Sequence, residues 1–375
     1  MIYLDNTATT EVKEEVLETF IQVTKQFIGN PNSIHLLGLQ SKKLMEEATS
    51  QVANLLKVKP NEIIFTSSSS ESNNLAIKGI LSFYKKRNKL VITTPLEHAS
   101  VLETIQAVEE AEVLFTPLDE TGHIKLDELE KLLQKEPVLV TIQHVNSETG
   151  IIQDITSIGK LIKKYPKTFF HVDGTQSVGK IPVDLENIDL FTFSAHKFFG
   201  LKGIACLIKK EKVNLTPLIH GGTSQSNYRA GTPSVALIAS LAKALRLALE
   251  NQKESYQHVK QLNCYLRKEL IKIPNINLNS KEEDSPYIIN FSIPNQKPET
   301  MIHRLEAHGI YISTNTACSS KNTYSKTLLA LGKEKDIAKS SLRIGLSSMT
   351  KQQEVETFIK ILREEILTNG TNYTD

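Results

Sequence analysis

The 375-residue sequence contains no tryptophan and only three cysteines, at positions 206, 264 and 318, without a Cys-x-x-Cys pair. Thiols so few and so far apart support neither a disulfide framework nor a zinc site. A net charge of +2 gives no sign of nucleic-acid or anionic-membrane binding. No apolar run approaches the roughly 20 residues of a membrane span, and the N-terminus has no signal-peptide pattern. We therefore expect a cytoplasmic protein without a metal, membrane or direct nucleic-acid partner.

What the sequence does contain is an ordinary globular composition and a repeating strand–helix pattern. Hydrophobic residues make up 40% and charged residues 23% of a chain long enough for two domains. Helical patterns separate most of seven strand-like segments, at 62–66, 89–94, 112–117, 138–145, 168–172, 189–194 and 203–208. This alternation predicts an α/β fold with a mostly parallel sheet covered by helices, where ligands gather at the carboxyl ends of the strands.

The chain changes character after residue 208. A loop rich in glycine, serine and threonine precedes an apolar helical pattern at 235–250, and the polar residues 251–255 mark a candidate domain boundary. Beyond it, helical patterns alternate with strand-like segments near 287–293 and 341–346. This part of the sequence predicts a smaller α+β domain.

One lysine stands in an unusual place, at the end of a predicted strand. Residues 191–203 read FTFSAHKFFGLKG, so Lys197 follows an apolar run and lies between a histidine and two phenylalanines. A lysine in a partly desolvated pocket becomes a nucleophilic amine, able to form a Schiff base with an aldehyde cofactor. A surface lysine after a buried strand is the alternative that this segment leaves open.

Two other strand ends carry groups that suit such a cofactor. Asp173 could keep a ring nitrogen protonated, as an electron-sink cofactor requires, and Gln176 could donate to a phenolic oxygen of the same ring. Residues 67–74 open a helix after a strand, and its N–H groups and serine hydroxyls would form an anion site. An aspartate capping a turn and a serine capping a helix are the simpler alternatives.

Further polar side chains point to the same strand ends. His98 begins a helix after a strand and could stack on a ring or transfer protons, although a structural histidine is the alternative. Asn146 and Glu148 follow the segment 138–145. Arg343 offers a bidentate fork for a substrate carboxylate, unless it forms an ordinary interdomain ion pair.

The three cysteines differ in their surroundings. Cys318 lies in a polar segment, STNTACSSKNT at 313–323, whereas Cys206 stands in an apolar strand pattern and Cys264 in a helical one. An exposed loop cysteine suits a nucleophile, while buried cysteines are usually inert. Cys318 is therefore the candidate nucleophile.

Together these motifs resemble a known family. The serine segment, His98, Asp173 and Lys197 occur in chain order, each after a predicted strand. Their order, spacing and residue types resemble the cysteine desulfurases of the class V aminotransferase group, similar to the NifS/IscS proteins. The resemblance runs nearly end to end through YLDNTATT at 3–10, GNPNS at 29–33, TSSSSESNN at 66–74, HVN at 144–146, HVDGTQSVGK at 171–180, SAHK at 194–197, RAGT at 229–232, ACS at 317–319 and Arg343.

The resemblance implies a fold type I pyridoxal-phosphate transferase with a seven-stranded sheet. A large cofactor-binding domain would span residues 12–253, and residues 1–11 with 254–375 would form a small domain that carries the cysteine segment. Pyridoxal 5′-phosphate would be bound to Lys197, with Asp173 at the pyridine nitrogen, Gln176 at the phenolate and His98 stacked on the ring. Its phosphate would contact Ser69, Ser70, Ser194, His196 and, from a second subunit, Thr232, so a homodimer is implied.

The resemblance also implies the reaction. Arg343 and Asn146 would hold the carboxylate of L-cysteine, and Asn146 would contact the cofactor as well. Lys197 and His98 would act in catalysis. The Cys318 thiolate would attack the substrate sulfur, which leaves a persulfide on the enzyme and releases L-alanine. The sulfur acceptor would be a tRNA-thiolation enzyme or an iron–sulfur scaffold protein, and the short segment after the last predicted helix favours the former.

The sequence departs from the family pattern at a few positions. Ser68 stands where the family usually has glycine, so we expect its backbone to be strained by about 1 kcal/mol. Ser69 and Ser70 replace an alanine–threonine pair, GTSQS at 222–226 replaces Gly-Gly-Gln-Glu, and Asn315 with Thr316 replaces Gly-Ser. None of these changes removes a group with a chemical role.

Two other functions stay open from the sequence. One is a different class V activity, selenocysteine lyase or aminotransferase, and a transaminase has no use for Cys318. The other is a non-catalytic persulfide carrier or regulatory partner, which would not need the intact Lys197, Asp173 and His98.

Overall fold

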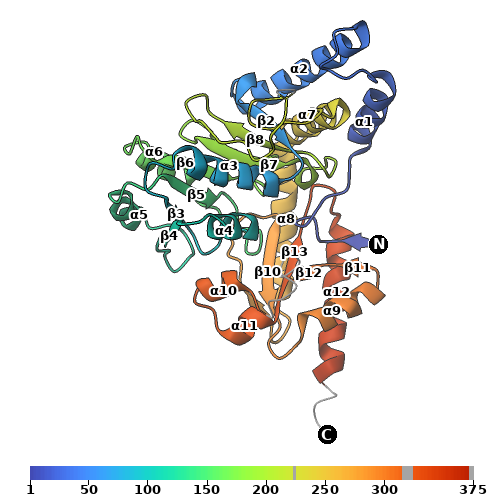
Figure 1. The fold of residues 1–375 in the computed structure, drawn as a ribbon. Coiled ribbons are helices and arrows are strands. Elements are labelled where there is room, and N and C mark those ends of the chain that lie inside the picture. The colour runs from blue at the N-terminus through green and yellow to red at the C-terminus, as the bar shows by residue number, and fades with distance from the viewer. Residues whose placement is uncertain (223–224, 315–323, 371–375) are drawn as a thin grey trace.

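The fold is built around a seven-stranded sheet, seen in a computed structural model that describes residues 1–222, 225–314 and 324–370. The strands are β2 (Ile63–Thr66), β3 (Leu90–Thr93), β4 (Glu112–Phe115), β5 (Leu139–Gln143), β6 (Phe169–Asp173), β7 (Leu190–Ser194) and β8 (Ala205–Lys209). Their order is β2-β8-β7-β6-β5-β3-β4, and only β8 runs antiparallel to its neighbours (Figure 1). This confirms the α/β fold with a mostly parallel sheet.

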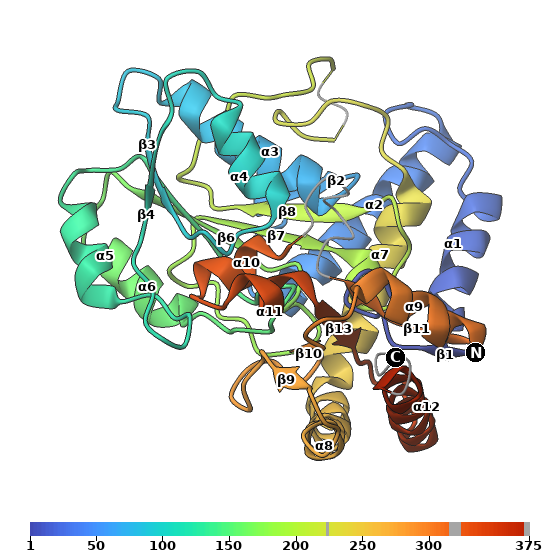
Figure 2. The same cartoon turned by 90° about the horizontal axis from the view of Figure 1, so that it is seen from below.

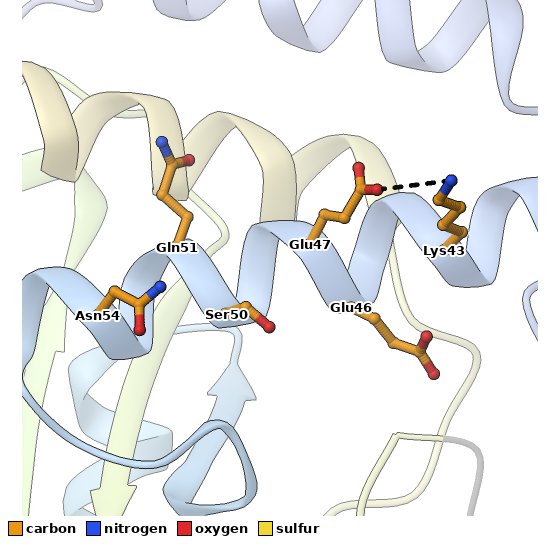
Figure 3. A pocket seen from close by; sticks show the side chains of 6 residues that line it. All are labelled: Lys43, Glu46, Glu47, Ser50, Gln51 and Asn54. Carbon is orange, nitrogen blue, oxygen red and sulfur yellow. Dashed lines mark ion pairs between the residues drawn. The ribbon is translucent and has the colours of Figure 1, made fainter.

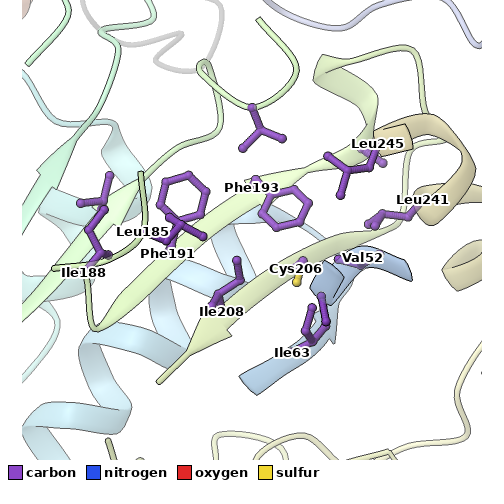
Figure 4. Packing of buried hydrophobic residues seen from close by; sticks show 14 of the residues in the cluster. Val52, Ile63, Leu185, Ile188, Phe191, Phe193, Cys206, Ile208, Leu241 and Leu245 are labelled. Carbon is purple, nitrogen blue, oxygen red and sulfur yellow. The ribbon is translucent and has the colours of Figure 1, made fainter. Parts of the chain in front are cut away.

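Helices cover both faces of this sheet because its strands are apolar on both sides. The helices of one side are α5 (Leu126–Leu133), α6 (Ile155–Ile162) and α7 (Val235–Glu250), with α1 (Glu14–Gln26) and α2 (Leu36–Leu56) packed on α7. The other side carries α3 (Ser69–Phe83) and α4 (Ala99–Gln106). Phe191 and Phe193 of β7 pack with Cys206 of β8 and with α7 (Figure 4). Burial raises the pKa of the Cys206 thiol, so this cysteine is an inert core residue.

The rest of the chain builds a second, smaller layer. Its antiparallel sheet has the order β12-β13-β10-β9, and β1 pairs with β11. The strands are β1 (Ile2–Tyr3), β9 (Asn277–Leu278), β10 (Ile288–Ser292), β11 (Ile310–Tyr311), β12 (Ser313–Thr314) and β13 (Ser341–Gly345). The helices are α8 (Gln252–Leu270), α9 (Pro298–Ala307), α10 (Lys326–Ala330), α11 (Lys335–Lys339) and α12 (Gln352–Gly370). A separate apolar core includes Phe291, Phe358 and Leu4.

The N-terminal segment joins the two layers. β1 lies beside β11 in the small layer (Figure 2), while the Thr10 N–H donates to the His196 carbonyl at 2.9 Å in the large one. Gly345 lets the segment pass, because a Cβ atom there would lie 2.4 Å from the Thr7 nitrogen. Residues 4–10 are therefore held between β13 and the turn after β7. Among the described residues, no helix is long and apolar enough to cross a membrane.

Candidate active site

Four of the predicted cofactor residues follow the carboxyl ends of parallel strands. Ser69 opens α3 after β2, His98 caps α4 after β3, Asp173 ends β6, and Lys197 ends the short 3₁₀ turn Ala195–Lys197 after β7. Parallel strands end at the same edge of a sheet, so these side chains share one edge.

A hydrogen-bonded group connects Asp173 to His98. One Asp173 oxygen accepts from Nδ2 of Asn73 at 2.8 Å, and the other accepts from the Thr175 N–H at 3.0 Å. Nδ2 of Asn73 also lies 2.9 Å from the Ser100 hydroxyl, which lies 2.8 Å from Nδ1 of His98. Asp173 is buried and held by two donors, which fixes the orientation of its carboxylate.

The serine segment forms the N-terminus of the 15-residue helix α3. Thr175 donates its hydroxyl to Oγ of Ser69 at 2.8 Å, which ties this helix end to the Asp173 group. Ser70 is exposed at the second helical position. The expectation of a strained Ser68 is wrong: its φ of −162° and ψ of 161° are extended backbone, because the residue is the N-cap and accepts from the Glu71 N–H at 3.2 Å.

Lys197 points into the molecule. Its Nζ donates to the carbonyl oxygens of Thr7 at 2.6 Å and Ala8 at 2.7 Å. Nε2 of Gln176 donates to the same Thr7 oxygen at 3.0 Å. The N-terminal segment thus brings together Lys197 and Gln176, and the amine faces the strand-end region rather than bulk solvent.

Of the other predicted phosphate ligands, Ser194 and His196 lie at or just after the end of β7, whereas Thr232 lies in a separate loop. Nδ1 of His196 lies 3.2 Å from the Thr9 hydroxyl, and burial, with the charge of Lys197, lowers the His196 pKa to about 4. A neutral imidazole can accept or donate one hydrogen bond. The buried Ser194 hydroxyl donates to the Ile204 carbonyl at 3.4 Å. Thr232 lies exposed in the loop between β8 and α7, outside this hydrogen-bonded group.

Asn146 is buried, and most of its side-chain hydrogen bonds go to backbone groups of its own loop and of Leu96. Its Oδ1 accepts from the N–H groups of Glu148 and Thr149, at 2.9 and 2.8 Å, and Nδ2 donates to the Leu96 carbonyl at 3.0 Å. The side chain therefore shapes the turn after β5 and keeps one amide hydrogen for a ligand.

Arg343 of β13 is buried and reaches the N-terminal segment. One terminal nitrogen donates to Oδ1 of Asp5 and to the Ser313 hydroxyl, both at 3.1 Å, and the other donates to the Ser147 carbonyl at 3.1 Å. Its Nε is buried without a partner among the described residues. A guanidinium with an unused buried donor is suited to a further acceptor such as a carboxylate.

The structure adds two acids at this edge that the motifs did not assign to the site: Glu97, which is buried, and Glu148, which is half-buried. Burial raises the pKa of Glu97 to about 8, with a contribution from the Asp173 charge, and its Oε2 has no partner among the described residues. Burial also raises the pKa of Glu148, whose carboxylate accepts from the Ser325 hydroxyl at 2.6 Å. Both acids adjoin predicted site residues, but the sequence has no signal for the burial of an acid.

A hollow of about 520 Å³ lies elsewhere, along α2. Figure 3 shows its polar lining, all of it from this one helix: Lys43, Glu46, Glu47, Ser50, Gln51 and Asn54. Polar side chains along one exposed helical face are typical of a solvated surface. The strand ends, where the buried polar groups gather, are the better candidate site.

A family model described as aminotransferase class V matches residues 2–358. The chain belongs to this family. Among its class V relatives, a NifS/IcsS protein homolog of Lactobacillus delbrueckii subsp. bulgaricus is 39% identical, with 97% of both chains covered. The cysteine desulfurase IscS of Dictyoglomus turgidum is 36% identical, with 97% of this chain and 94% of the relative covered. The resemblance inferred from the motifs is thereby confirmed.

Solved structures agree with this class V assignment. A NifS-like protein superposes with a TM-score of 0.92 at 36% identity, covering 98% of this chain and 99% of the other. A protein described as SspA in complex with cysteine superposes with a TM-score of 0.81 at 30% identity, covering 94% of this chain and all of the other. These similarities confirm the fold expected for a NifS-like class V protein.

One predicted residue of this class V chain, Cys318, lies outside the described residues. The structure in turn adds groups that the motifs did not single out. Asn73, Ser100 and Thr175 connect the predicted residues, while Thr7 accepts hydrogen bonds from two of them and Asp5 pairs with a third. Thr7 and Asp5 lie in the N-terminal motif, but only the folded chain shows which partners they meet.

Proposed function

We propose that this protein is a pyridoxal-phosphate-dependent cysteine desulfurase that converts L-cysteine to L-alanine and a persulfide on Cys318. The observation that carries the proposal is the grouping of Lys197, Asp173 and His98 at one sheet edge in a chain of the NifS/IscS-like family. The two sequence relatives reported above are named as a NifS/IcsS homolog and a cysteine desulfurase, and each is similar to this chain over nearly its full length.

The described residues fit the cofactor. Asp173 offers a charged acceptor for a ring N–H, and the α3 N-terminus with Ser69 and Ser70 offers backbone N–H groups and hydroxyls to a phosphate. The Lys197 amine is near the N-terminal segment and could hold an aldehyde carbon. We propose that Ser194, His196 and, from a second subunit, Thr232 complete the phosphate site, so that a homodimer is the active form.

When bound, pyridoxal phosphate supplies an electron sink for negative charge that develops on the substrate Cα. Arg343 binds the substrate carboxylate through its unused Nε–H, and Asn146 donates its remaining amide hydrogen. His98 would move a proton between substrate and solvent, since it caps α4 at the same edge of the sheet as Asp173 and Lys197. The Cys318 thiolate attacks the substrate sulfur: an S–S bond forms, the C–S bond breaks with its electron pair left on carbon, and that carbon takes up a proton to become the methyl group of alanine.

The proposal is tested by following the visible spectrum of the purified holoenzyme on addition of L-cysteine, then assaying alanine and protein-bound persulfide. We expect a spectral change, alanine in amounts that exceed the enzyme when a thiol acceptor is present, and persulfide on Cys318. A protein that stays colourless with added pyridoxal phosphate would contradict the proposal and favour a non-catalytic carrier.

Asp5 is expected to compete with the substrate carboxylate for Arg343. Its side chain is about one-fifth exposed and pairs with the guanidinium at 3.1 Å. In Asp5→Asn, the KM for cysteine should fall about two- to fivefold, the size of a partly exposed ion pair, with little change in kcat. Glu11→Gln, an exposed acid on the same segment, is the control and should leave KM unchanged. An unchanged or raised KM in Asp5→Asn would show that Asp5 does not compete.

The sulfur acceptor and the domain boundaries are also proposals. We propose a tRNA-thiolation enzyme or an iron–sulfur scaffold protein as acceptor, and pull-down from cells lysed under mild conditions would distinguish the two. A large domain of residues 12–253 and a small one of residues 1–11 with 254–375 are supported by separate apolar cores: two lie on the large sheet, and a third consists of Leu4 and residues from 259 onward, with Val145 and Ile181 from the large domain. The protein is expected to work in the cytoplasm.

A further inference from the structure

A second lysine, Lys180, is buried beside the proposed cofactor site. It stands in the turn after β6, four residues beyond Gln176, and is 7% exposed. Gly179 allows this close packing, because its φ is +77° and a Cβ atom there would lie 2.8 Å from that of Ala248 in α7. No carboxylate forms an ion pair with Lys180 in the part of the chain that is described. A buried ammonium without a counter-ion is costly, so its presence calls for a reason.

Lys180 is connected to Lys197 by hydrogen bonds. Its Nζ donates to Oε1 of Gln176 at 2.8 Å, Nε2 of Gln176 donates to the Thr7 carbonyl at 3.0 Å, and Nζ of Lys197 donates to that same carbonyl at 2.6 Å. A protonated Lys180 can only donate, so Oε1 faces it, which fixes the orientation of the Gln176 amide. The second hydrogen of Nε2 is then available to an acceptor in the site.

The two lysines also line one cavity of about 30 Å³, together with Tyr287, whose ring centre lies 5.8 Å from Nζ of Lys180. The other titratable or charged groups around them are Lys13, His196, Lys202 and Arg343, the last paired with Asp5. Asp5 is the one acid among these groups, and it is paired with Arg343, so the described surroundings of the two lysines supply no free negative charge. Burial lowers the pKa of Lys180 to about 7, and the like charges of Lys197 and Arg343 add to the shift.

We propose that Lys180 is a positioning residue of this site: it fixes the Gln176 amide toward the bound ring and disfavours a proton on the Lys197 nitrogen. Two ammonium groups in one buried cavity repel each other, so each makes the other easier to deprotonate. The neutral Lys197 amine is the form that can bond to an aldehyde. The role of Gln176 toward the bound ring rests on the proposed function. The effect of the Lys180 charge on the Lys197 amine does not, because it can be measured in the apoprotein.

The test compares three substitutions at Lys180 with a matched buried lysine. Lys180→Met removes the charge and the donor at similar length, Lys180→Gln keeps a donor without charge, and Lys180→Arg keeps both. Lys209→Met is the control: Lys209 is also buried, but it pairs with Leu190 at the opposite end of β7, and its amine donates to the carbonyls of Lys210 and Val213.

The first readout is the pH dependence of Lys197 acetylation in the apoprotein, measured by peptide mass spectrometry with trace acetic anhydride. Loss of a neighbouring positive charge favours the protonated amine, so the midpoint should rise by about one pH unit in Lys180→Met and Lys180→Gln. It should stay at or below the wild-type value in Lys180→Arg, because arginine keeps its charge at every pH of the titration, and it should match the wild-type value in Lys209→Met. If Lys180→Met and Lys180→Gln both kept the wild-type midpoint, or if Lys209→Met raised it equally, the claim that the Lys180 charge disfavours a proton on Lys197 would be overturned.

The second readout is pyridoxal-phosphate binding to the apoprotein, followed by absorbance. Lys180→Met should bind about tenfold more weakly, while Lys180→Gln should lose less, because it can still donate to Gln176. Equal affinity in Lys180→Met and wild type would overturn the positioning part. If the wild-type holoenzyme forms no alanine from cysteine while the Lys197 midpoint still rises in the neutral variants, Lys180 acts on Lys197 as proposed and the cysteine desulfurase assignment is the part that fails.

Discussion

Replacing Lys197 with alanine is expected to abolish the visible cofactor absorbance and to lower alanine formation from cysteine by about 10⁴-fold or more. The amine is the only lysine nitrogen that the structure holds against both the Thr7 and Ala8 carbonyls among the described residues. Without it, no group at this position can bond to an aldehyde carbon, and the electron sink cannot be fixed over the substrate. Absorbance spectra and an alanine assay on the same preparation measure both effects.

Lys202→Ala is the matched control, because Lys202 is exposed and lies five residues further along the same turn region. It should keep the absorbance and most of the activity. Full activity in Lys197→Ala would remove Lys197 from the mechanism. Unfolding would be a separate cause of inactivity, so the melting temperature of the variant should be measured and should stay close to that of the wild-type apoprotein.

Replacing Cys318 with alanine is expected to lower alanine formation from cysteine by about 10³-fold or more, while the cofactor absorbance stays unchanged. The thiolate is the proposed acceptor of the substrate sulfur, and no hydroxyl or amine can form the persulfide in its place. Alanine release and protein-bound persulfide, measured on the same reaction, report the two products of one step.

Cys264→Ala provides the control for this experiment. Cys264 is exposed on α8, so it shares the chemical reactivity of a surface thiol but lies in the small layer away from the strand ends. It should retain activity. If Cys318→Ala still formed alanine from cysteine at the normal rate, Cys318 would not be the sulfur acceptor and the protein would be a lyase of the same family. Activity on selenocysteine in that variant would single out selenocysteine lyase.

Much of the fold follows from local sequence pattern. All seven strands of the large sheet lie within the predicted segments or within a residue of them, and the apolar pattern at 235–250 matches α7. Strand–helix alternation is encoded over short stretches, so it can be read without knowing the tertiary structure. The two-residue strands β1, β9, β11 and β12 show the limit: strands this short carry too little pattern, and none of these four was predicted.

Ser68 shows a different limit. The family pattern places glycine there, which made a left-handed backbone the natural expectation. The residue instead lies in extended backbone and caps α3 with its hydroxyl. The preceding strand decides the direction from which the chain enters the helix, and that direction determines whether a side chain is tolerated.

The sequence by itself determined which chemical groups this protein has at its strand ends: Lys197, Asp173, His98 and the serine segment each follow a strand, and a parallel sheet brings such positions to one edge. Only the tertiary structure decided how they are connected. Asp5 meets Arg343 across more than three hundred residues, Thr7 accepts from Lys197 and Gln176, and Lys180 is buried with no carboxylate paired to it among the described residues. Contacts so distant in the chain leave no periodic signal, because they depend on how two separately packed layers enclose the N-terminal segment.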